Sequence, residues 1–262
     1  MKVGYLGPKS SFTFQAANEI FPENTLISFA SIPLTIEQLE NKSLDFAVVP
    51  IENSLEGSVH ATVDYLFDQS AITIKKEVIL PIRQQLLGTH FVEQVEKILS
   101  HPQALAQTEQ YLKKHYPEVP LEAVSSTTAA AQYVTEHPHD KVLAIASKKA
   151  AEEYDLQVLA KDIQDNSMNK TRFWLLSVDK NKQNLTRYQN KKVTLFVSLP
   201  ANLPGALHQV LSAFAWRKID LAKIESRPLK TYLGEYFFII DILLDENEVL
   251  IENAIKEIEL LH

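Results

Sequence analysis

The sequence predicts an α/β protein with a large first domain and a smaller α+β second domain, and three observations support this prediction. From the N-terminus to about Ser177, short β-branched runs alternate with segments whose apolar residues recur at helical spacing. The stretch 179–192 has almost no apolar residue and is typical of a linker. Beyond this stretch the order of strand-like and helix-like segments changes, which indicates a second fold.

The first domain is expected to hold a largely parallel sheet, because helices separate its strands. Each predicted strand is a short run rich in β-branched and other apolar residues: Val3–Leu6, Leu26–Phe29, Phe46–Val49, Ala71–Ile74, Val95–Leu99, Leu121–Val124, Val142–Ala146, Leu156–Leu159 and Arg172–Leu176. Helices are expected to begin near Thr13, Thr35, Ser58, Ala104, Thr128 and Lys148.

The second domain begins with alternating apolar residues at positions 193, 195, 197 and 199, as a half-buried strand requires. Asn202–Gly205 interrupts this pattern, and a helix is expected from Leu207. Two strands, Leu221–Glu225 and Tyr236–Leu244, precede a last helix over 251–258. This β-α-β-β-α order is most of a ferredoxin-like unit, without its final strand.

Composition excludes several classes of function. The 26 Lys and Arg residues against 33 Asp and Glu residues give a formal charge of -7, so no nucleic-acid partner is expected. The sequence has no cysteine, no glycine-rich nucleotide-binding motif and no HExxH spacing, so thiol chemistry, dinucleotides and metals are not expected. No apolar run reaches membrane-helix length and the N-terminus lacks a secretion signal, so we expect a soluble cytoplasmic protein without a membrane partner.

Five predicted strand-to-helix junctions are rich in hydroxyl, amide and small side chains: 7–11, 50–54, 100–103, 125–128 and 146–148. In parallel α/β sheets such junctions lie at the carboxyl edge, where ligands bind. Helix N-termini carry free N–H groups and a partial positive charge, so several together favour a small carboxylated ligand. The alternative is that these residues only cap helices.

Two further segments combine polar groups with an apolar strand. Asn169–Trp174 places a hydroxyl and a guanidinium at the start of one strand, and Ile224–Pro228 ends another with charges before a proline. Taken singly, the first segment is more typical of an ordinary strand start with a surface Arg, and the second of a solvated turn.

Read in order, short stretches of the chain resemble the prephenate dehydratase family with its C-terminal ACT regulatory domain. The stretches are Gly4–Pro8, Val48–Gly57, Ser100–Leu105, Ser126–Ala130, Asn169–Phe173, Pro204–Leu207 and Glu225–Pro228. The resemblance spans essentially the whole chain.

The resemblance implies a catalytic domain over 1–178 built of two α/β lobes, like a type II periplasmic binding protein. Lobe 1 is expected at about 1–78 and 160–178 and lobe 2 at about 79–159, with crossings near Lys76–Arg83 and Val158–Lys161. A linker at 179–192 and an ACT domain over 193–262 follow.

The resemblance also implies a lyase that converts prephenate to phenylpyruvate, water and carbon dioxide, in phenylalanine biosynthesis. No cofactor is expected, because the substrate supplies the electrons and needs only a hydrogen-bond or proton donor for its leaving hydroxyl. By resemblance Thr171 is that donor, and Arg172 holds a substrate carboxylate. The expected orienting residues are Asn53, Ser54, Gln103, Ser126 and Thr127, while Phe173 packs behind the strand.

Two alternatives stay open. One is an enzyme that acts on arogenate, the amino analogue of prephenate, and the other is a non-catalytic small-molecule-binding or amino-acid-sensing protein on the same fold.

The resemblance implies feedback inhibition by phenylalanine, bound between copies of the chain in a homodimer or homotetramer. The expected site lies between the loop of Asn202, Leu203, Pro204, Gly205, Ala206 and Leu207 and the strand end at Glu225 and Ser226 of a second copy.

The chain departs from the family pattern at two glycine positions. Ser10-Ser11-Phe12 stands where Gly-Thr-Phe is expected, so the first loop lacks a flexible position. Asp155 replaces a glycine at a helix end, where Asp tolerates the left-handed conformation.

Overall fold

The computed structural model describes residues 1–22, 25–67, 71–91, 93–179, 191–199, 204–231, 235–244 and 248–260. The chain divides into two compact units, residues 1–185 and 186–262. Most of the expected linker, as well as Asn202 and Leu203, lies outside the described residues. Within the described part of the chain, no helix is long and apolar enough to span a membrane.

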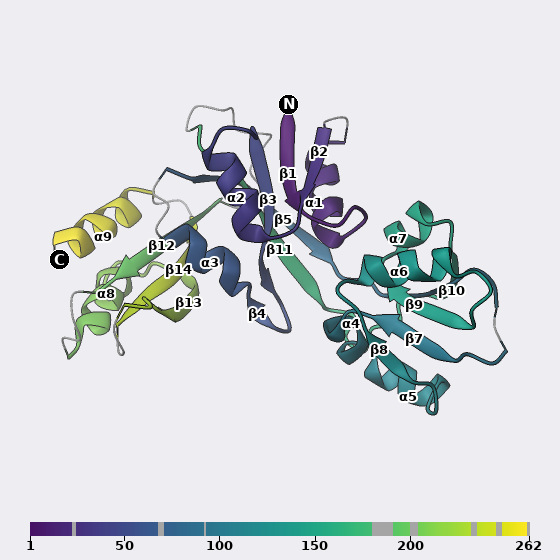
Figure 1. The fold of residues 1–262 in the computed structure, drawn as a ribbon. Coiled ribbons are helices and arrows are strands. Elements are labelled where there is room, and N and C mark those ends of the chain that lie inside the picture. The colour runs from purple at the N-terminus through teal and green to yellow at the C-terminus, as the bar shows by residue number, and fades with distance from the viewer. Residues whose placement is uncertain are drawn as a thin grey trace. The chain divides into compact units, whose positions relative to one another are not determined.

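The first unit contains two sheets, each with its own helices (Figure 1). The first lobe has strand order β2-β1-β3-β11-β5, and β4 pairs with β3. Its elements are β1 (Lys2–Leu6), α1 (Phe12–Ile20), β2 (Thr25–Phe29), α2 (Ile32–Glu40), β3 (Phe46–Asn53), β4 (Gly57–Ser58), α3 (His60–Phe67), β5 (Thr73–Pro81) and β11 (Lys170–Ser177).

The second lobe has strand order β10-β6-β9-β7-β8. Its elements are β6 (Gln85–Gly88), β7 (Lys97–Ser100), α4 (Pro102–Ala106), α5 (Glu109–His115), β8 (Leu121–Ala123), α6 (Thr127–Glu136), β9 (Val142–Ala146), α7 (Lys148–Glu153) and β10 (Gln157–Ala160).

The α/β class is confirmed, but the expectation of largely parallel sheets is wrong. Strand β1 is parallel to β2 and β3, whereas β11 is antiparallel to both β3 and β5. In the second lobe β7 is parallel to β8 and β9, whereas β6 is antiparallel to β9 and β10. Apart from the β3–β4 hairpin, the antiparallel pairs involve the strands through which the chain enters and leaves a lobe at the two crossings.

Several local predictions also need correction. Strand β6 and helix α5 were not expected, and the helix predicted near Ala104 begins at Pro102. The segment 50–54 does not join a strand to a helix: β3 continues to Asn53 and turns into the short strand β4. The strand expected over Ala71–Ile74 instead runs from Thr73 to Pro81 and makes up much of the first crossing.

Alternate residues of β11 are buried in the core of the first lobe, and this packing fixes the position of the strand. Phe173 and Leu175 are buried at 2% and 0% exposure in a core with α1 residues Ala16 and Ala17. Burial of one such large apolar side chain contributes roughly 1.5–3 kcal/mol. Because strand residues two apart share a face, Thr171 lies on the same side as Phe173.

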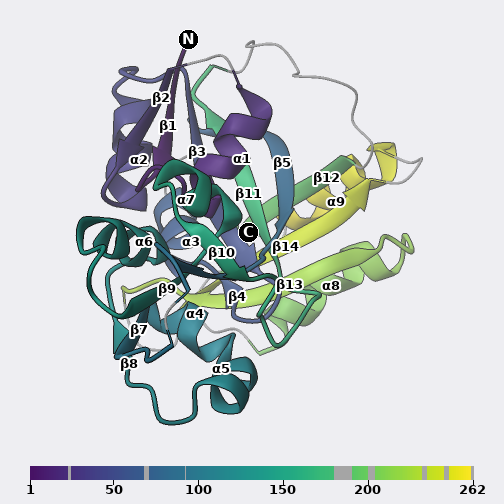
Figure 2. The same cartoon turned by 90° about the vertical axis from the view of Figure 1, so that its right-hand side faces the viewer.

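The second unit consists of β12 (Lys191–Ser198), α8 (Ala206–Ala215), β13 (Leu221–Pro228), β14 (Tyr236–Leu244) and α9 (Glu248–Leu260), which confirms the predicted β-α-β-β-α order (Figure 2). In the described part of this unit the sheet order is β12-β14-β13, and both pairs are antiparallel. The helices bury Val210, Phe214 and Ile251 against Ile240 and Ile242 of the central strand.

Candidate active site

A cavity of about 520 Å³ opens between the two lobes of the first unit. Its lining from the first lobe includes Ser11, Phe12, Asn53, Glu56, Thr171 and Phe173, and its lining from the second lobe includes His101, Gln103, Gln107, Ser126 and Thr127. The structure thus brings Asn53, Gln103, Ser126, Thr127, Thr171 and Phe173 of the expected site residues to one cavity.

Thr171 lies at the start of β11 and is 9% exposed. The Nδ2 atom of Asn53 donates a hydrogen bond to its Oγ1 over 2.9 Å. The side-chain oxygen of Asn53, Oδ1, accepts from the backbone N–H of Leu55 at 3.0 Å and of Glu56 at 3.3 Å. Because the backbone donors fix the oxygen end of this amide, its nitrogen end must face Thr171.

The Thr171 hydroxyl is therefore an acceptor toward Asn53, and its own hydrogen is directed elsewhere. Across the described residues, no hydrogen bond from this hydroxyl to a protein acceptor is found. A hydroxyl with its lone pair engaged and its hydrogen free presents a donor to a molecule in the cavity.

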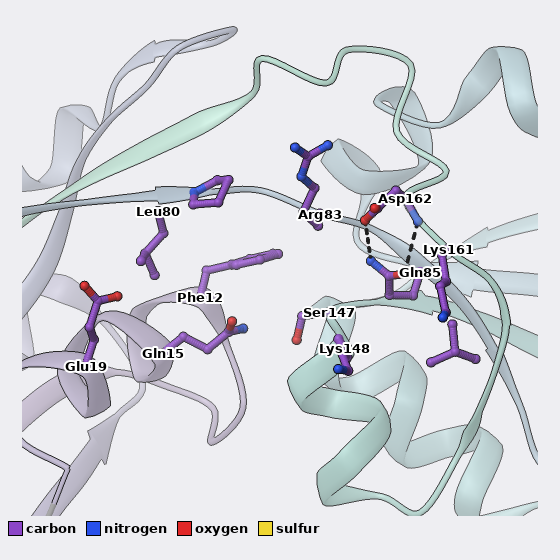
Figure 3. A pocket seen from close by; sticks show the side chains of 12 residues that line it. Phe12, Gln15, Glu19, Leu80, Arg83, Gln85, Ser147, Lys148, Lys161 and Asp162 are labelled. Atoms are coloured by element: carbon purple, nitrogen blue, oxygen red, sulfur yellow. Dashed lines mark hydrogen bonds between the residues drawn. The ribbon is translucent and has the colours of Figure 1, made fainter.

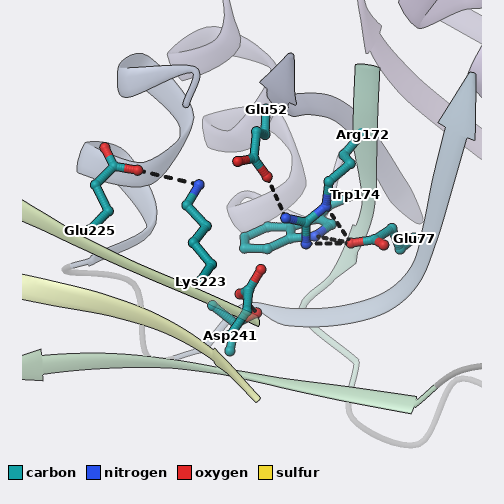
Figure 4. Close-up of polar contacts among 8 residues, drawn as sticks. Glu52, Glu77, Arg172, Trp174, Lys223, Glu225 and Asp241 are labelled. Carbon is teal, nitrogen blue, oxygen red and sulfur yellow. Dashed lines mark hydrogen bonds and ion pairs between the residues drawn. The ribbon is translucent and has the colours of Figure 1, made fainter. Parts of the chain in front are cut away.

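Arg172 points away from this cavity. Its Nη1 donates to Glu52 Oε2 at 2.5 Å, and its Nη2 and Nε donate to Glu77 Oε2 at 2.6 and 2.9 Å (Figure 4). Trp174 Nε1 also lies 3.4 Å from Glu77 Oε2. These residues join β3, β11 and β5 on the face opposite to Thr171, so the placement does not support direct contact between Arg172 and a substrate.

Ser54 also lies outside the residues that line the cavity. It is exposed, and its Oγ accepts from the backbone N–H of Lys170 at 3.0 Å. The bond ties the end of β3 to the start of β11, so Ser54 supports the local backbone instead of facing the cavity.

Two helices begin at the cavity, and their N-termini carry partial positive charge. Ser11 caps α1 by accepting from Phe14 N–H at 3.1 Å, and Ser126 caps α6 by accepting from Ala129 N–H at 2.9 Å. Both helices begin among the lining residues, whereas no Lys or Arg of the described chain lines this cavity. Backbone N–H groups and helix dipoles are thus available to hold an anion.

Three polar residues of this region are not among those predicted from the sequence: Glu56, Gln107 and Asn169. Asn169 Oδ1 accepts from Asn53 at 2.8 Å, and Asn169 Nδ2 donates to Gln107 Oε1 at 3.0 Å. Gln107 Nε2 donates to Glu56 Oε1 at 3.2 Å. Glu56 and Asn169 lie in two of the stretches that resemble the family, and Gln107 follows Gln103 by four residues, one helical turn.

A second cavity of about 480 Å³ lies between α1 and the two crossings (Figure 3). Arg83, Lys148 and Lys161 are among its lining residues, and on the side of the second lobe Gln85 Nε2 donates to Asp162 Oδ1 at 3.1 Å. It shares Phe12 with the first cavity but contains none of the expected catalytic or substrate-binding residues. Of the two cavities, only the first is lined by expected catalytic and substrate-binding residues.

In the second unit, Gly205 precedes α8 with a left-handed φ of 88°, which a side chain would strain. Pro204 and Gly205 are exposed, Ala206 is buried and Leu207 is half-buried. Glu225 pairs with Lys223 at 3.3 Å (Figure 4), while the neighbouring Ser226 lies on the other face of β13. These placements describe a single copy of the chain.

The fold and the site are those of a two-lobe protein whose cavity between the lobes can hold a small organic anion and offer it a hydroxyl donor. Residues 3–181 match the family model for prephenate dehydratase, and residues 193–260 match that for the ACT domain. The chain therefore belongs to the prephenate dehydratase family and carries an ACT domain, which confirms the resemblance seen in the sequence.

Similar proteins agree with this assignment. The chain is 48% identical over 259 residues to a prephenate dehydratase of Lactococcus lactis subsp. lactis, covering 98% of this chain and 92% of the relative. It is 45% identical over 270 residues to a prephenate dehydratase of Bacillus subtilis, covering 100% and 95%. The structure of an Arthrobacter aurescens prephenate dehydratase in complex with L-Phe matches with a TM-score of 0.87 and 34% identity, covering 99% and 86%.

Proposed function

We propose that this protein is a hydro-lyase that converts prephenate to phenylpyruvate, water and carbon dioxide. The observation that carries the proposal is the Thr171 hydroxyl, which accepts from Asn53 at 2.9 Å and keeps its hydrogen for the cavity. Membership of the prephenate dehydratase family supports it.

The reaction needs a donor at one oxygen atom. When the ring carboxylate leaves as carbon dioxide, the electron pair of its bond enters the ring, and the hydroxyl on the opposite ring carbon departs with the pair of its C–O bond. The leaving oxygen gathers negative charge and takes up a proton to become water. Thr171 donates to this oxygen and stabilises the charge as it develops.

The substrate carboxylates are held by the ends of two helices. The first turns of α1 and α6 offer backbone N–H groups beside the capping residues Ser11 and Ser126. Gln103 and Thr127 add side-chain donors from the second lobe. Arg172 instead steadies β11 from its opposite face, and Phe173 packs behind Thr171.

The test is phenylpyruvate formation from prephenate by the purified protein and by Thr171→Ala, with arogenate assayed in parallel. We expect turnover by the wild type and a loss of kcat of roughly a hundredfold or more in the variant. Turnover that survives in the variant would assign the donor to another group. Faster turnover of arogenate would make it the substrate, and binding without turnover of either compound would indicate a sensor.

We further propose that phenylalanine inhibits the enzyme through the ACT domain, with the ligand between two copies. The left-handed Gly205 at the start of α8 supports this, because a glycine there lets a carboxylate approach backbone N–H groups. We expect Gly205→Asp to weaken inhibition while uninhibited turnover persists. Inhibition identical to that of the wild type would rule out this loop as the site.

We also propose that the protein forms a homodimer or a homotetramer. Its proposed location is the cytoplasm. Sedimentation equilibrium with and without phenylalanine measures the assembly. A monomer under both conditions would exclude a ligand site between copies.

A further inference from the structure

A chain of hydrogen bonds runs from the Thr171 hydroxyl through three side-chain amides to a carboxylate. Asn53 Nδ2 donates to both Thr171 Oγ1 and Asn169 Oδ1, at 2.9 and 2.8 Å. Asn169 Nδ2 then donates to Gln107 Oε1 at 3.0 Å, and Gln107 Nε2 donates to Glu56 Oε1 at 3.2 Å. The chain links the first lobe to Gln107, which ends helix α4 of the second lobe.

The Glu56 carboxylate fixes which group donates and which accepts in every hydrogen bond of this series. An ionised carboxylate only accepts, so Gln107 must present its nitrogen to Glu56 and its oxygen to Asn169. Asn169 must then present its nitrogen to Gln107 and its oxygen to Asn53. The two N–H groups of Asn53 then point to Asn169 and Thr171, its two shorter contacts, while the Lys170 carbonyl oxygen lies 3.3 Å from the same nitrogen. This agrees with the backbone bonds to the Asn53 side-chain oxygen.

Asn169 is the central member of the chain and does not face the cavity. It is 1% exposed and is absent from the residues that line the cavity. Its side chain has two polar ends, both engaged by other members of the chain. Its influence on a bound molecule must pass through Asn53 and Gln107.

We propose that Asn169 is a positioning residue for the dehydration step: it holds the Asn53 nitrogen against the Thr171 oxygen, so that the Thr171 hydroxyl is a donor toward the substrate. The inference rests on the proposed function and adds to it a residue that touches neither substrate nor reacting atoms. It assigns Glu56 the role of setting the polarity of the chain through Gln107.

The test uses Asn169→Asp in the full-length protein. The new carboxylate opposes the Gln107 oxygen, and turning the Gln107 amide would bring that oxygen against Glu56. The repulsion displaces the carboxylate, and with it the Asn53 nitrogen that it holds. We expect kcat for prephenate to fall by about tenfold or more, while KM changes by less than about threefold. The matched control is Asn166→Asp, which adds the same charge three residues earlier on an exposed side chain.

A double-mutant cycle with Glu56→Gln separates orientation from general damage. In the Glu56→Gln background the Gln107 amide can turn, because a neutral amide can donate to its oxygen. We expect Asn169→Asp to lower kcat at least about threefold less in this background than in the wild type. Equal losses in the two backgrounds, or a KM effect as large as the kcat effect, would overturn the proposal.

Thermal unfolding midpoints of the same four proteins give a readout that requires no turnover. The same coupling is expected in the midpoints, since opposed oxygens also destabilise the folded state. A wild type that fails to turn over prephenate but shows this coupling would refute the proposed function and leave the orientation of the chain standing. If Asn169→Asp does not fold, Asn169→Ser replaces it, because its hydroxyl is too short to reach both neighbours, and the same selective loss of kcat is expected.

Discussion

Asn53 and Thr171 are joined by a hydrogen bond of 2.9 Å in which the amide is the donor and the hydroxyl the acceptor. The backbone N–H of Leu55 holds the other end of the Asn53 amide at 3.0 Å, so the roles cannot be exchanged. This relationship turns a threonine, whose hydroxyl can serve either as donor or as acceptor, into a donor toward the cavity. A change that reverses the roles should therefore affect chemistry more than binding.

Asn53→Asp makes that reversal with almost no change in shape. The new carboxylate keeps its bonds to the backbone N–H groups of Leu55 and Glu56 but can only accept, so Thr171 donates to it instead of to the substrate. The bond that Asn53 donates to Asn169 is also lost. We expect kcat for prephenate to fall roughly a hundredfold with a small change in KM, measured by steady-state phenylpyruvate formation.

The double variant Asn53→Asp with Thr171→Ala is the control for this prediction. If both changes act on one hydroxyl, the double variant should be no slower than Thr171→Ala alone. Losses that multiply would mean that Asn53 contributes to catalysis independently of Thr171.

Arg172→Met tests whether Arg172 supports the strand or holds a substrate carboxylate. The change removes the guanidinium from between Glu52 and Glu77, whose side chains are 24% and 22% exposed. Removing one partner of a fully buried ion pair costs roughly 3–5 kcal/mol, so at this partial exposure we expect the free energy of unfolding to fall by about 2 kcal/mol. Denaturant titration measures it.

The exposed Arg83 provides the matched control. Arg83→Met is expected to change the free energy of unfolding by less than about 0.5 kcal/mol. If Arg172→Met is as stable as the wild type and its KM is much larger, Arg172 holds a substrate carboxylate instead of supporting the strand.

The position of Arg172 also shows what the sequence could and could not predict. Residues two apart in a strand share a face, so alternation places Arg172 on the face opposite to Thr171 and Phe173, whereas the resemblance implies that Arg172 contacts the substrate. Conversely, the apolar runs of β1, β3 and β9 were predictable because burial on both faces leaves a continuous apolar pattern.

Other features depend on tertiary contacts that no local pattern encodes. Strand β6 has the short sequence QLLG, which carries no alternation, and its antiparallel pairing follows from the chain crossing between lobes. Gln107 meets Asn169 from a position 62 residues away in sequence. Helix caps and apolar stripes are local, whereas an amide chain across two lobes exists only after both have folded.

The pKa of Tyr65 gives a prediction for alkaline pH. Burial, together with the hydrogen bond to Glu40 at 3.0 Å, raises the pKa of Tyr65 to about 12, above its ordinary value of 10.0. The unfolded chain thus loses this proton first as pH rises. The contribution of Tyr65 to stability is complete below pH 10 and is lost as pH rises to about 12.

Tyr65→Phe should remove this part of the pH dependence. We expect the variant to be less stable than the wild type at pH 8, and its free energy of unfolding to fall less steeply between pH 10 and 12. Urea titrations at a series of pH values measure both slopes. Parallel slopes for the two proteins would show that the Tyr65 pKa is not raised in the folded state.

Ser10 occupies the position where the family pattern has glycine, and its backbone is left-handed with a φ of 69°. Its side chain is 1% exposed, and its Oγ has no hydrogen-bond partner among the described residues. The left-handed backbone costs about 1–2 kcal/mol for a residue with a side chain, and a buried unsatisfied hydroxyl costs about 1–3 kcal/mol more.

Ser10→Gly should therefore stabilise the protein. The greater entropy of glycine in the unfolded chain offsets roughly 0.5–1 kcal/mol, so we expect a net gain of about 1 kcal/mol or more and a midpoint of thermal unfolding about 2–4 °C higher. Asp155→Gly is the matched comparison, because Asp155 is also left-handed, with a φ of 52°, but is exposed and of a type that tolerates this conformation. We expect little change there. A lower midpoint for Ser10→Gly, or an equal gain at both positions, would show that the buried hydroxyl of Ser10 is not a source of instability.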